Sequence, residues 1–204
     1  MKLLVCISKV PDTTSKINFV DNNTKFDENG VQYIVNPYDE WYALVRALEL
    51  VEAQGGSVTT ITVGTASDDP TIRKALAIGA NDAVRIDADT SDPHFVAKQI
   101  AEYAKNENYD IILTGKETIN YNGSQIGGMI AEMLNTPFVS LASKLDVNNN
   151  VATLERDVKG GVEVVEVITP FVLSAAKGMA EQRIPNMRGI TVSYTHLRAH
   201  ETPV

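Results

Sequence analysis

Residues 115–128 contain the groups with the clearest potential for ligand binding. They read Gly-Lys-Glu-Thr-Ile-Asn-Tyr-Asn-Gly-Ser-Gln-Ile-Gly-Gly, follow an apolar run over residues 109–114, and lead into an apolar segment that predicts a helix from near Asn122. Where a buried strand of an open α/β sheet meets a helix, exposed backbone N–H groups and the positive end of the helix dipole attract phosphate. The first expectation is therefore a ligand that carries a phosphate group.

Three other polar segments are expected to lie beside this one, namely residues 8–14, 36–39 and 64–69. Because the strand-to-helix loops of a parallel sheet leave from one edge, residues 8–14, 64–69 and 115–124 should form one rim, which residues 36–39 at a helix start could join. Asn36 is predicted to cap the free N–H groups of a helix in which Pro37 is the first residue. Each of these residues alone is more typical of a turn or a cap, but together on one rim they favour a binding site.

Groups that could catalyse a reaction are scarce. The sequence lacks G-x-x-x-x-G-K-[ST] and a G-x-G-x-x-G after a strand, which weakens kinase and dinucleotide-dehydrogenase interpretations. His94 is predicted to be a surface residue at a helix start, and Lys116 a solvated charge that is able to reach a phosphate. Cys6 ends an apolar strand and is predicted to be buried, with a ligand contact permitted by its place at the rim. The residues favour a protein that holds a nucleotide over one that converts it, and no catalytic residue is predicted.

Composition narrows the classes of partner. The chain has 204 residues, 44% of them hydrophobic, and a formal net charge of -8, which predicts one substantial core and argues against nucleic acid or an anionic membrane as partner. The single cysteine, Cys6, excludes an internal disulfide and favours a reducing compartment, so a cytoplasmic location is predicted. No apolar run reaches the roughly 18 residues of a membrane span, and no signal-peptide pattern is found.

Alternating strand and helix patterns predict a mostly parallel, doubly wound, Rossmann-like α/β sheet with helices on both faces. A change of pattern after residue 134 predicts antiparallel hairpins appended to this core. The expected strands are residues 2–7, 31–35, 58–63, 83–86, 110–114, 137–145, 151–158, 162–169 and 171–175, and the expected helices begin at residues 37, 70, 93 and 125.

Five segments together resemble the beta subunit of electron transfer flavoproteins. They are residues 5–13 (Val-Cys-Ile-Ser-Lys-Val-Pro-Asp-Thr), 36–39 (Asn-Pro-Tyr-Asp), 71–80 (Thr-Ile-Arg-Lys-Ala-Leu-Ala-Ile-Gly-Ala), 115–125, and 184–187 (Ile-Pro-Asn-Met). Any one of them is weak, but their order and spacing over roughly residues 1–190 are specific. The resemblance implies one nucleotide-binding domain over these residues, with a fold similar to that of the adenine nucleotide alpha hydrolases.

The resemblance implies an electron carrier rather than an enzyme. Such a beta subunit binds AMP and pairs with an alpha subunit that holds most of a redox-active FAD. The pair takes electrons from dehydrogenases such as those of acyl-CoA in fatty acid β-oxidation, and passes them to a quinone reductase. Carried over to this sequence, the AMP contacts are Cys6, Asn36, Pro37, Tyr38, Asp39, Thr65, Gly115, Lys116, Asn120, Asn122, Gly123, Ser124, Gln125 and Ile126.

The same resemblance makes residues 177–190 a recognition loop that docks on partner dehydrogenases. Ile184 would be its apolar anchor, accompanied by Pro185, Asn186 and Met187. Without the resemblance, the segment reads as an exposed linker with one isoleucine.

Two positions depart from the family pattern. A family aromatic that reaches the flavin would fall near Thr13, where this chain has a small side chain. Residues 10–13 resemble an electron-bifurcating branch whose beta subunit binds a second FAD in place of AMP, but residues 87–95 do not match that branch. AMP is therefore the expected ligand, and FAD the alternative.

The sequence from Thr191 onward looks like translated sequencing-adapter DNA fused to a truncated reading frame, so residues 191–204 are expected to be a non-native tail and are not used to predict the fold. His196 and His200 have an i, i+4 spacing that suits a metal, but no third ligand is evident and no metal site is predicted. Two other functions remain open. One is an adenine-nucleotide hydrolase or transferase that uses Asp12, Asp68 or Asp69 for a metal, and the other is a homodimeric nucleotide sensor.

Overall fold

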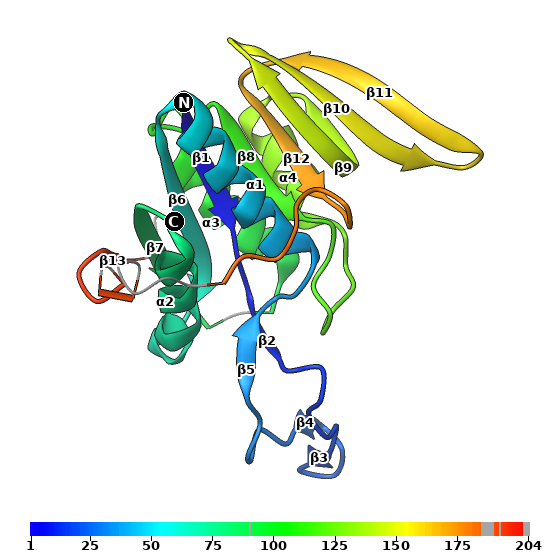
Figure 1. The fold of residues 1–204 in the computed structure, drawn as a ribbon. Coiled ribbons are helices and arrows are strands. Elements are labelled where there is room, and N and C mark those ends of the chain that lie inside the picture. Colours follow the sequence, from blue (N-terminus) through cyan, green and yellow to red (C-terminus); the bar gives the residue numbers. More distant parts are fainter. Residues whose placement is uncertain (90, 185–189, 192, 202–204) are drawn as a thin grey trace.

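The computed structural model describes residues 1–89, 91–184, 190–191 and 193–201. Within this part of the chain, nine strands form one sheet in the order β11-β10-β9-β12-β8-β1-β6-β7-β13 (Figure 1). Their bounds are Lys2–Cys6 (β1), Ser57–Gly64 (β6), Asp82–Asp87 (β7), Ile111–Gly115 (β8), Phe138–Asn148 (β9), Val151–Val158 (β10), Gly161–Ile168 (β11), Phe171–Ala175 (β12) and Leu197–His200 (β13).

The sheet is parallel from β9 to β13, and only β10 and β11 run antiparallel to their neighbours. The chain passes from β1 outward through β6 and β7, and then returns to the other side of β1 with β8. The direction of winding therefore reverses between β1 and β8, which is where ligands bind in open α/β sheets. The α/β fold with an appended antiparallel hairpin agrees with the prediction from the sequence.

Four α-helices of the described residues cover the sheet, two on each face (Figure 1). The first pair, α1 (Asp39–Gln54) and α2 (Asp69–Ile78), packs on one face, and the second pair, α3 (Pro93–Ala104) and α4 (Ile126–Leu134), packs on the other. A short 3₁₀ turn, η1 (Ala66–Asp68), precedes α2. Helix α1 ends at Gly55, whose φ of 81° suits glycine.

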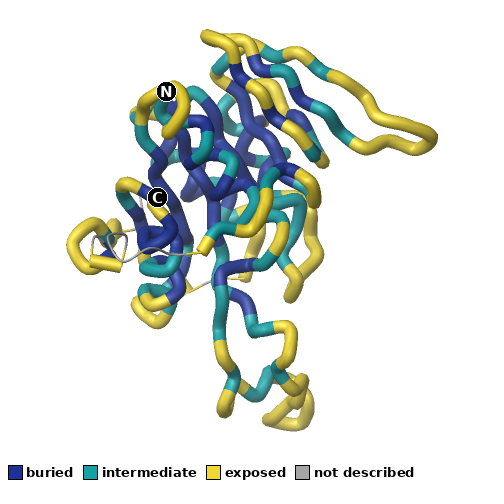
Figure 2. Tube along the Cα trace, in the orientation of Figure 1, coloured by how far each residue is buried: buried dark blue, intermediate teal, exposed yellow. Residues whose placement is uncertain are grey.

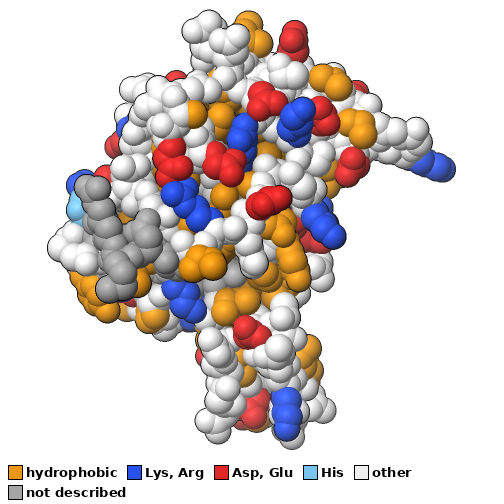
Figure 3. Space-filling model, in the orientation of Figure 1, with side chains coloured by type: hydrophobic (Ala, Val, Ile, Leu, Met, Phe, Trp, Pro, Cys, Tyr) orange, Lys and Arg blue, Asp and Glu red, His pale blue; other side chains and the backbone are white. Residues whose placement is uncertain are grey.

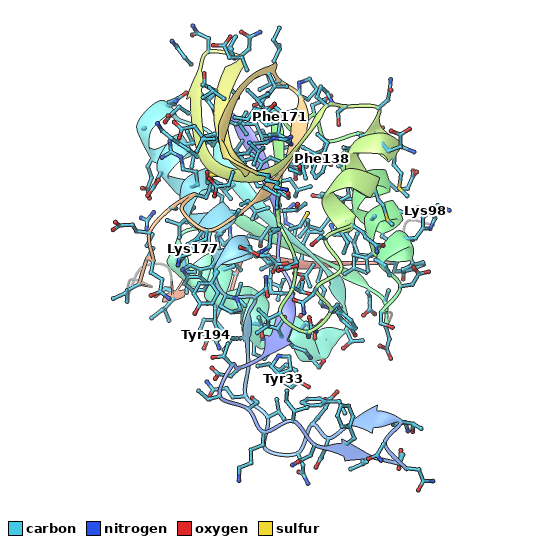
Figure 4. All side chains as sticks on the ribbon, turned by 90° about the vertical axis from the view of Figure 1, so that its right-hand side faces the viewer. Tyr33, Lys98, Phe138, Phe171, Lys177 and Tyr194 are labelled. Carbon is cyan, nitrogen blue, oxygen red and sulfur yellow. The ribbon has the colours of Figure 1, made fainter. Side chains whose placement is uncertain are left out.

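The core follows from the two-residue period of the strands. In β1, Leu3 and Val5 pack toward α1, whereas Leu4 and Cys6 pack toward α3 and α4. Both faces of the central strands are buried (Figure 2), which suits the largely apolar sequences of β1, β8 and β12. Figure 4 shows Phe171 of β12 inside this body, and its side chain is 1% exposed.

A narrow segment projects from the sheet edge at which β1 ends (Figure 1). Its ribbon pairs β2 (Lys9–Pro11) with β5 (Tyr33–Val35), and its tip pairs β3 (Phe19–Val20) with β4 (Lys25–Phe26). None of residues 11–34 is buried (Figure 2). The prediction that all of residues 8–14 lie on the rim is therefore wrong for residues 12–14, because the β2–β5 ladder leads the chain away from the sheet.

The end of the chain also joins the sheet. Strand β13 pairs in parallel with β7, and the His196 carbonyl accepts a hydrogen bond from the Ala83 N–H at 3.1 Å. The Arg73 guanidinium on α2 donates to the Ser193 carbonyl at 2.6 Å. Extended backbone explains why the i, i+4 spacing of His196 and His200 does not form a helical ligand pair, since that spacing brings side chains together only on a helix.

Candidate nucleotide-binding site

The rim lies where β1, β6 and β8 end, at Cys6, Gly64 and Gly115. This is the lower edge of the sheet in Figure 1, from which the loop after β8 extends. Direct hydrogen bonds and close contacts join the loops that were predicted to meet there. The convergence expected from the parallel topology is therefore present in the structure.

The loop after β1 is fixed through Ser8. The Glu40 carboxylate accepts hydrogen bonds from the Ser8 backbone N–H at 2.7 Å and from the Ser8 hydroxyl at 2.8 Å. The Ser8 carbonyl in turn accepts from the Asn36 N–H at 3.0 Å. Three polar groups of one residue thus connect β1 to the turn before α1.

Asn36 joins that turn to the loop after β8. Its side chain is fully buried, its amide donates to the Glu117 carbonyl at 2.9 Å, and its oxygen accepts from the Ile119 N–H at 3.0 Å. The prediction that Asn36 caps a helix beginning at Pro37 is wrong. The helix begins at Asp39, and its preceding residue, Tyr38, has a φ of 64° and makes no side-chain capping bond.

Tyr38 and Asp39 lie at the mouth of this junction. Tyr38 is 55% exposed and contacts the Tyr42 ring edge-on, with a 6.2 Å centroid separation. A left-handed φ is uncommon for a bulky residue and occurs mainly at functional turns. Partial burial raises the pKa of the Asp39 carboxyl, and the Lys116 ammonium opposes this shift.

The loop after β6 is held by Lys9. The Lys9 ammonium lies 2.6 Å from an Asp68 carboxylate oxygen, donates to the Ser67 hydroxyl at 3.0 Å, and lies 4.6 Å from the centre of the Tyr33 ring. Figure 4 shows Tyr33 where the projecting segment joins the body. Thr65 shares a 2.9 Å hydroxyl contact with Ser67, so this part of the rim is also ordered by short polar contacts.

The loop after β8 presents the exposed part of the rim. Lys116 pairs with Glu117 at 3.0 Å, and the Ser124 hydroxyl donates to Glu117 at 3.1 Å. Of the remaining predicted contacts, Asn120, Asn122, Gly123 and Gln125 are exposed and Ile126 is half-buried. The prediction of a helix from near Asn122 is wrong, because Asn122 and Ser124 have φ values of 50° and 53° and α4 begins at Ile126.

The backbone before α4 has a geometry that can bind an anion, because Asn122 and Ser124 adopt left-handed conformations close to the start of the helix. The side chain of Gln125, the N-cap residue of α4, makes no capping hydrogen bond. Successive residues that alternate between right- and left-handed backbone conformations point their N–H groups into a concave anion site. The positive end of the helix dipole adds to this attraction. This part of the rim therefore fits a phosphate group.

Two glycines permit the close packing behind the loop. A Cβ on Gly115 would lie 2.6 Å from Cγ and 3.0 Å from the backbone nitrogen of Glu40. A Cβ on Gly127 would lie 2.7 Å from the Thr114 hydroxyl and 2.9 Å from the Phe138 ring. Only glycine allows β8 and α4 to approach their neighbours so closely.

Cys6 lies beneath the rim with its thiol buried. Burial, and then the neighbouring Glu40 carboxyl, raise the pKa of the Cys6 thiol well above its ordinary value. The side chain therefore packs as a small apolar group, as predicted, and is not a reactive thiolate.

The three carboxylates considered for a metal each have a separate partner. Asp12, which lies on the projecting segment and not on the rim, accepts from the Thr14 N–H and hydroxyl, Asp68 pairs with Lys9, and Asp69 accepts from Arg85 at 2.8 Å. Among the described residues, no three His, Cys, Asp or Glu side chains are grouped for a metal ion. These pairings disfavour the hydrolase interpretation, which needs a carboxylate near the phosphates.

Two buried charged residues of the rim were not anticipated from the sequence. Glu40 is 5% exposed, and Arg85, which is 6% exposed, also bonds the Gly64 carbonyl at 3.1 Å and Asp87 at 2.6 Å. The burial of Arg85 could have been suspected from the sequence, because this charged residue lies within an apolar strand. The burial of Glu40 could not, because a glutamate in the first turn of a helix is common and usually exposed.

Two hollows of the described residues lie away from the rim. A hollow of about 300 Å³ is lined by residues including Met1, Gln54 and Asp110, and another of about 340 Å³ lies among residues 14–32 of the projecting segment. Neither includes a rim residue named above. The case for the rim therefore rests on its contacts and backbone geometry.

The predicted recognition loop crosses α1 before it reaches Ile184. Met179 is buried in the core, and Arg183 donates to Glu52 of α1 at 2.6 Å. Ile184 is 86% exposed. Pro185, Asn186 and Met187 lie outside the described residues.

The surface of the molecule includes His94 and charged side chains of both signs. His94 is exposed at the start of α3, where its N–H donates to the capping Asp92, as predicted. On the face shown in Figure 3, acidic and basic side chains are interspersed over α1 and its neighbours. No helix of the described part is both long and apolar enough to span a membrane.

Comparison with known proteins gives one consistent result. The model of the electron transfer flavoprotein domain matches residues 23–195. The chain is 36% identical over 194 residues to "Electron transfer flavoprotein subunit beta" of Bacillus subtilis, covering 93% of this chain and 74% of that protein. It is 34% identical over 198 residues to the subunit beta of Thermoanaerobacterium thermosaccharolyticum, covering 95% and 75%. A mitochondrial subunit beta from Oryza sativa subsp. indica is 33% identical over 209 residues, covering 100% and 82%.

Proposed function

This chain belongs to the electron transfer flavoprotein family as a beta subunit, and from this premise we propose that it holds AMP at the rim and supports electron transfer by an FAD bound mainly to an alpha subunit. Membership of the family gives the general role in electron transfer and a partner alpha subunit. The identity of the nucleotide, the contact residues and the partner dehydrogenases are the content of the proposal.

The observation that carries the proposal is the junction of four rim segments by Ser8, Asn36, Glu40 and Lys9. These contacts join the segments that carry the proposed AMP contacts, next to the change of winding of the sheet, and this supports the proposal. The exposed loop from Asn120 to Gln125 and the start of α4 supply N–H groups for the phosphate. The turn at residues 36–39 and Thr65 would flank the rest of the nucleotide.

The rim residues hold and orient the nucleotide and do no chemistry of their own. FAD supplies the redox chemistry when it is bound. Because the loops are already hydrogen-bonded to one another, AMP adds to a largely formed site, which lowers the ordering cost of binding. AMP then serves as a structural ligand that covers the exposed N–H groups.

Release of the ligand from denatured complex, followed by mass spectrometry, identifies the nucleotide. AMP in amounts equal to the beta subunit supports the proposal, with one FAD per heterodimer. Two FAD molecules per heterodimer and no AMP would assign the chain to the electron-bifurcating type. ATP turnover with magnesium would favour the hydrolase, and a stable homodimer without an alpha subunit would favour the sensor.

We also propose that residues 177–190 dock on acyl-CoA and related dehydrogenases, and that the reduced carrier then delivers electrons to a quinone reductase. The exposed Ile184 suits an apolar pocket on a partner. Replacing Ile184 with Ala should raise the KM of a donor dehydrogenase for the carrier about tenfold or more, as for an anchor worth ~2 kcal/mol. An unchanged KM would remove the loop from the docking surface.

Location and domain limits complete the proposal. We place the protein in the cytoplasm, with residues 1–190 as one domain and residues 191–204 as a non-native end. The pairing of β13 with β7 is a property of this sequence, whether or not residues 191–204 belong to the native protein. The intact mass of the protein isolated from its native source tests that origin directly.

A further inference from the structure

Glu40 occupies the point where three rim elements meet. Its backbone begins α1, its carboxylate faces the loop after β1, and its Cγ lies where a Cβ of Gly115 would be 2.6 Å away. At 5% exposure it is the most buried carboxylate named in the rim. A buried carboxyl group is costly unless its hydrogen bonds are made, so its retention here needs a reason.

Both carboxylate oxygens are used within the protein. One accepts from the Ser8 N–H and the other from the Ser8 hydroxyl. With both oxygens engaged, Glu40 acts on the site through Ser8. Ser8 in turn holds Asn36 by its carbonyl, and Asn36 holds the loop at residues 117–119.

We propose that Glu40 is the positioning residue of the nucleotide site, which sets the loop after β1, the turn before α1 and the end of β8 at the spacing that AMP requires. This inference rests on the proposed AMP function and adds a residue that the family resemblance did not assign. Loss of the carboxyl group frees Ser8, and through Asn36 it loosens the loop that presents Asn120 to Gln125.

Protonation of Glu40 gives a signal that a purely structural residue lacks. Burial raises the pKa of this carboxyl to about 8 against the opposing hydrogen bonds from Ser8. The groups that face it are the Cys6 thiol on β1 and the Asp39 carboxyl on α1, with Lys116 and Glu117 beyond Asp39 on the loop after β8. A phosphate anion brought to this rim favours the neutral carboxyl further. Binding of AMP near pH 8 is therefore coupled to uptake of a proton by Glu40.

The test is titration of AMP into the nucleotide-stripped complex of the full chain with its alpha subunit. Measurements at pH 8 in two buffers with different ionisation enthalpies give both the affinity and the number of protons taken up. Glu40→Ala, which removes both hydrogen bonds to Ser8, should weaken AMP binding about 5- to 20-fold, as for one or two lost hydrogen bonds. Glu40→Gln, which keeps the size of the neutral side chain but does not titrate, should abolish the proton uptake. Glu49→Gln, on the exposed side of the same helix, is the matched control and should change neither.

Ser8→Ala keeps the backbone bond to Glu40 and removes only the hydroxyl bond, so it should weaken AMP binding by a smaller factor. It serves as the second variant if Glu40→Ala does not fold. AMP binding that is unchanged in Glu40→Ala and Ser8→Ala, together with proton uptake that is unchanged in Glu40→Gln, would overturn the positioning role and leave the AMP function standing. A wild-type complex that binds no AMP would overturn the proposed function itself, and this inference with it.

Discussion

The Asn36 side-chain oxygen accepts a hydrogen bond from the Ile119 N–H at 3.0 Å, although the two residues are 83 positions apart in the chain. The Asn36 amide donates to the neighbouring Glu117 carbonyl. The buried Asn36 side chain thus offers the loop after β8 one donor and one acceptor, as the backbone of a neighbouring strand would. The shape of the proposed nucleotide loop is thus set by a residue from a different element.

Replacing Asn36 with Ala should lower the free energy of unfolding by about 1–3 kcal/mol, since two partly buried backbone groups lose their partners. Asn36→Asp keeps the acceptor for Ile119 but loses the donor to Glu117, so an intermediate loss is expected. Urea denaturation of the purified complex gives both values. A loss below about 0.5 kcal/mol for the alanine variant would mean that the loop holds its shape without Asn36.

Replacing Gly115 with Ala should destabilise the protein by about 1–3 kcal/mol, because the new methyl group overlaps the Cγ and backbone nitrogen of Glu40. Gly123 is the matched control in the same loop. It has no atom within 4 Å of an added Cβ, so Gly123→Ala should be close to neutral. Thermal melting of the two variants side by side decides the point, and equal melting temperatures would contradict the close approach at Gly115.

The contribution of Glu40 to the free energy of unfolding should fall as the pH rises from about 4.5 to about 8. Its pKa is raised from 4.5 to about 8 in the folded state. The folded protein therefore binds the proton more tightly than the unfolded chain, and this stabilisation is complete below pH 4.5 and is lost as the pH approaches 8.

Glu40→Gln removes this titration, so the difference in unfolding free energy between wild type and variant should change across the same pH range. Denaturation curves at pH 5, 7 and 9 provide the measurement, with Glu49→Gln as the control. A difference that is constant with pH would show that Glu40 does not keep its proton on folding.

Replacing Arg183 with Gln should raise the KM of a donor dehydrogenase for the carrier roughly two- to fivefold, with little change in melting temperature. The ion pair with Glu52 is partly exposed and contributes little to folding, but it holds the chain directly before Ile184. Exchanging the two charges, with Arg183→Glu and Glu52→Arg in one protein, should restore the KM. If the exchange fails while Arg183→Gln has its effect, Arg183 contacts the partner itself.

Removing AMP should lower the melting temperature of the complex, and adding it back should raise it with concentration. A ligand at 100 times its dissociation constant stabilises the folded state by about 2.7 kcal/mol. GMP at the same concentrations is the control for a general phosphate effect. A melting temperature that does not depend on AMP would argue against a structural role for the nucleotide.

Much of the architecture was already present in the order of residues. The apolar runs at β1 and β8, the start of α3 at Pro93 and the end of α1 at Gly55 follow from local rules, because strand burial, proline and glycine act within a few residues. Parallel topology then placed the loops after β1, β6 and β8 on one rim. Five short motifs added the resemblance to a family, and the comparisons established that membership.

Only the tertiary structure decided how the rim is held together. Asn36 has the sequence signature of a helix cap, yet its side chain bonds a loop more than 80 residues away. Glu40 has the signature of an exposed first-turn glutamate, yet it is buried against Ser8 and Gly115. Helix and strand propensities depend on near neighbours, whereas the partners of a buried polar group are chosen by packing of the whole chain, and so these two residues could be assigned only in three dimensions.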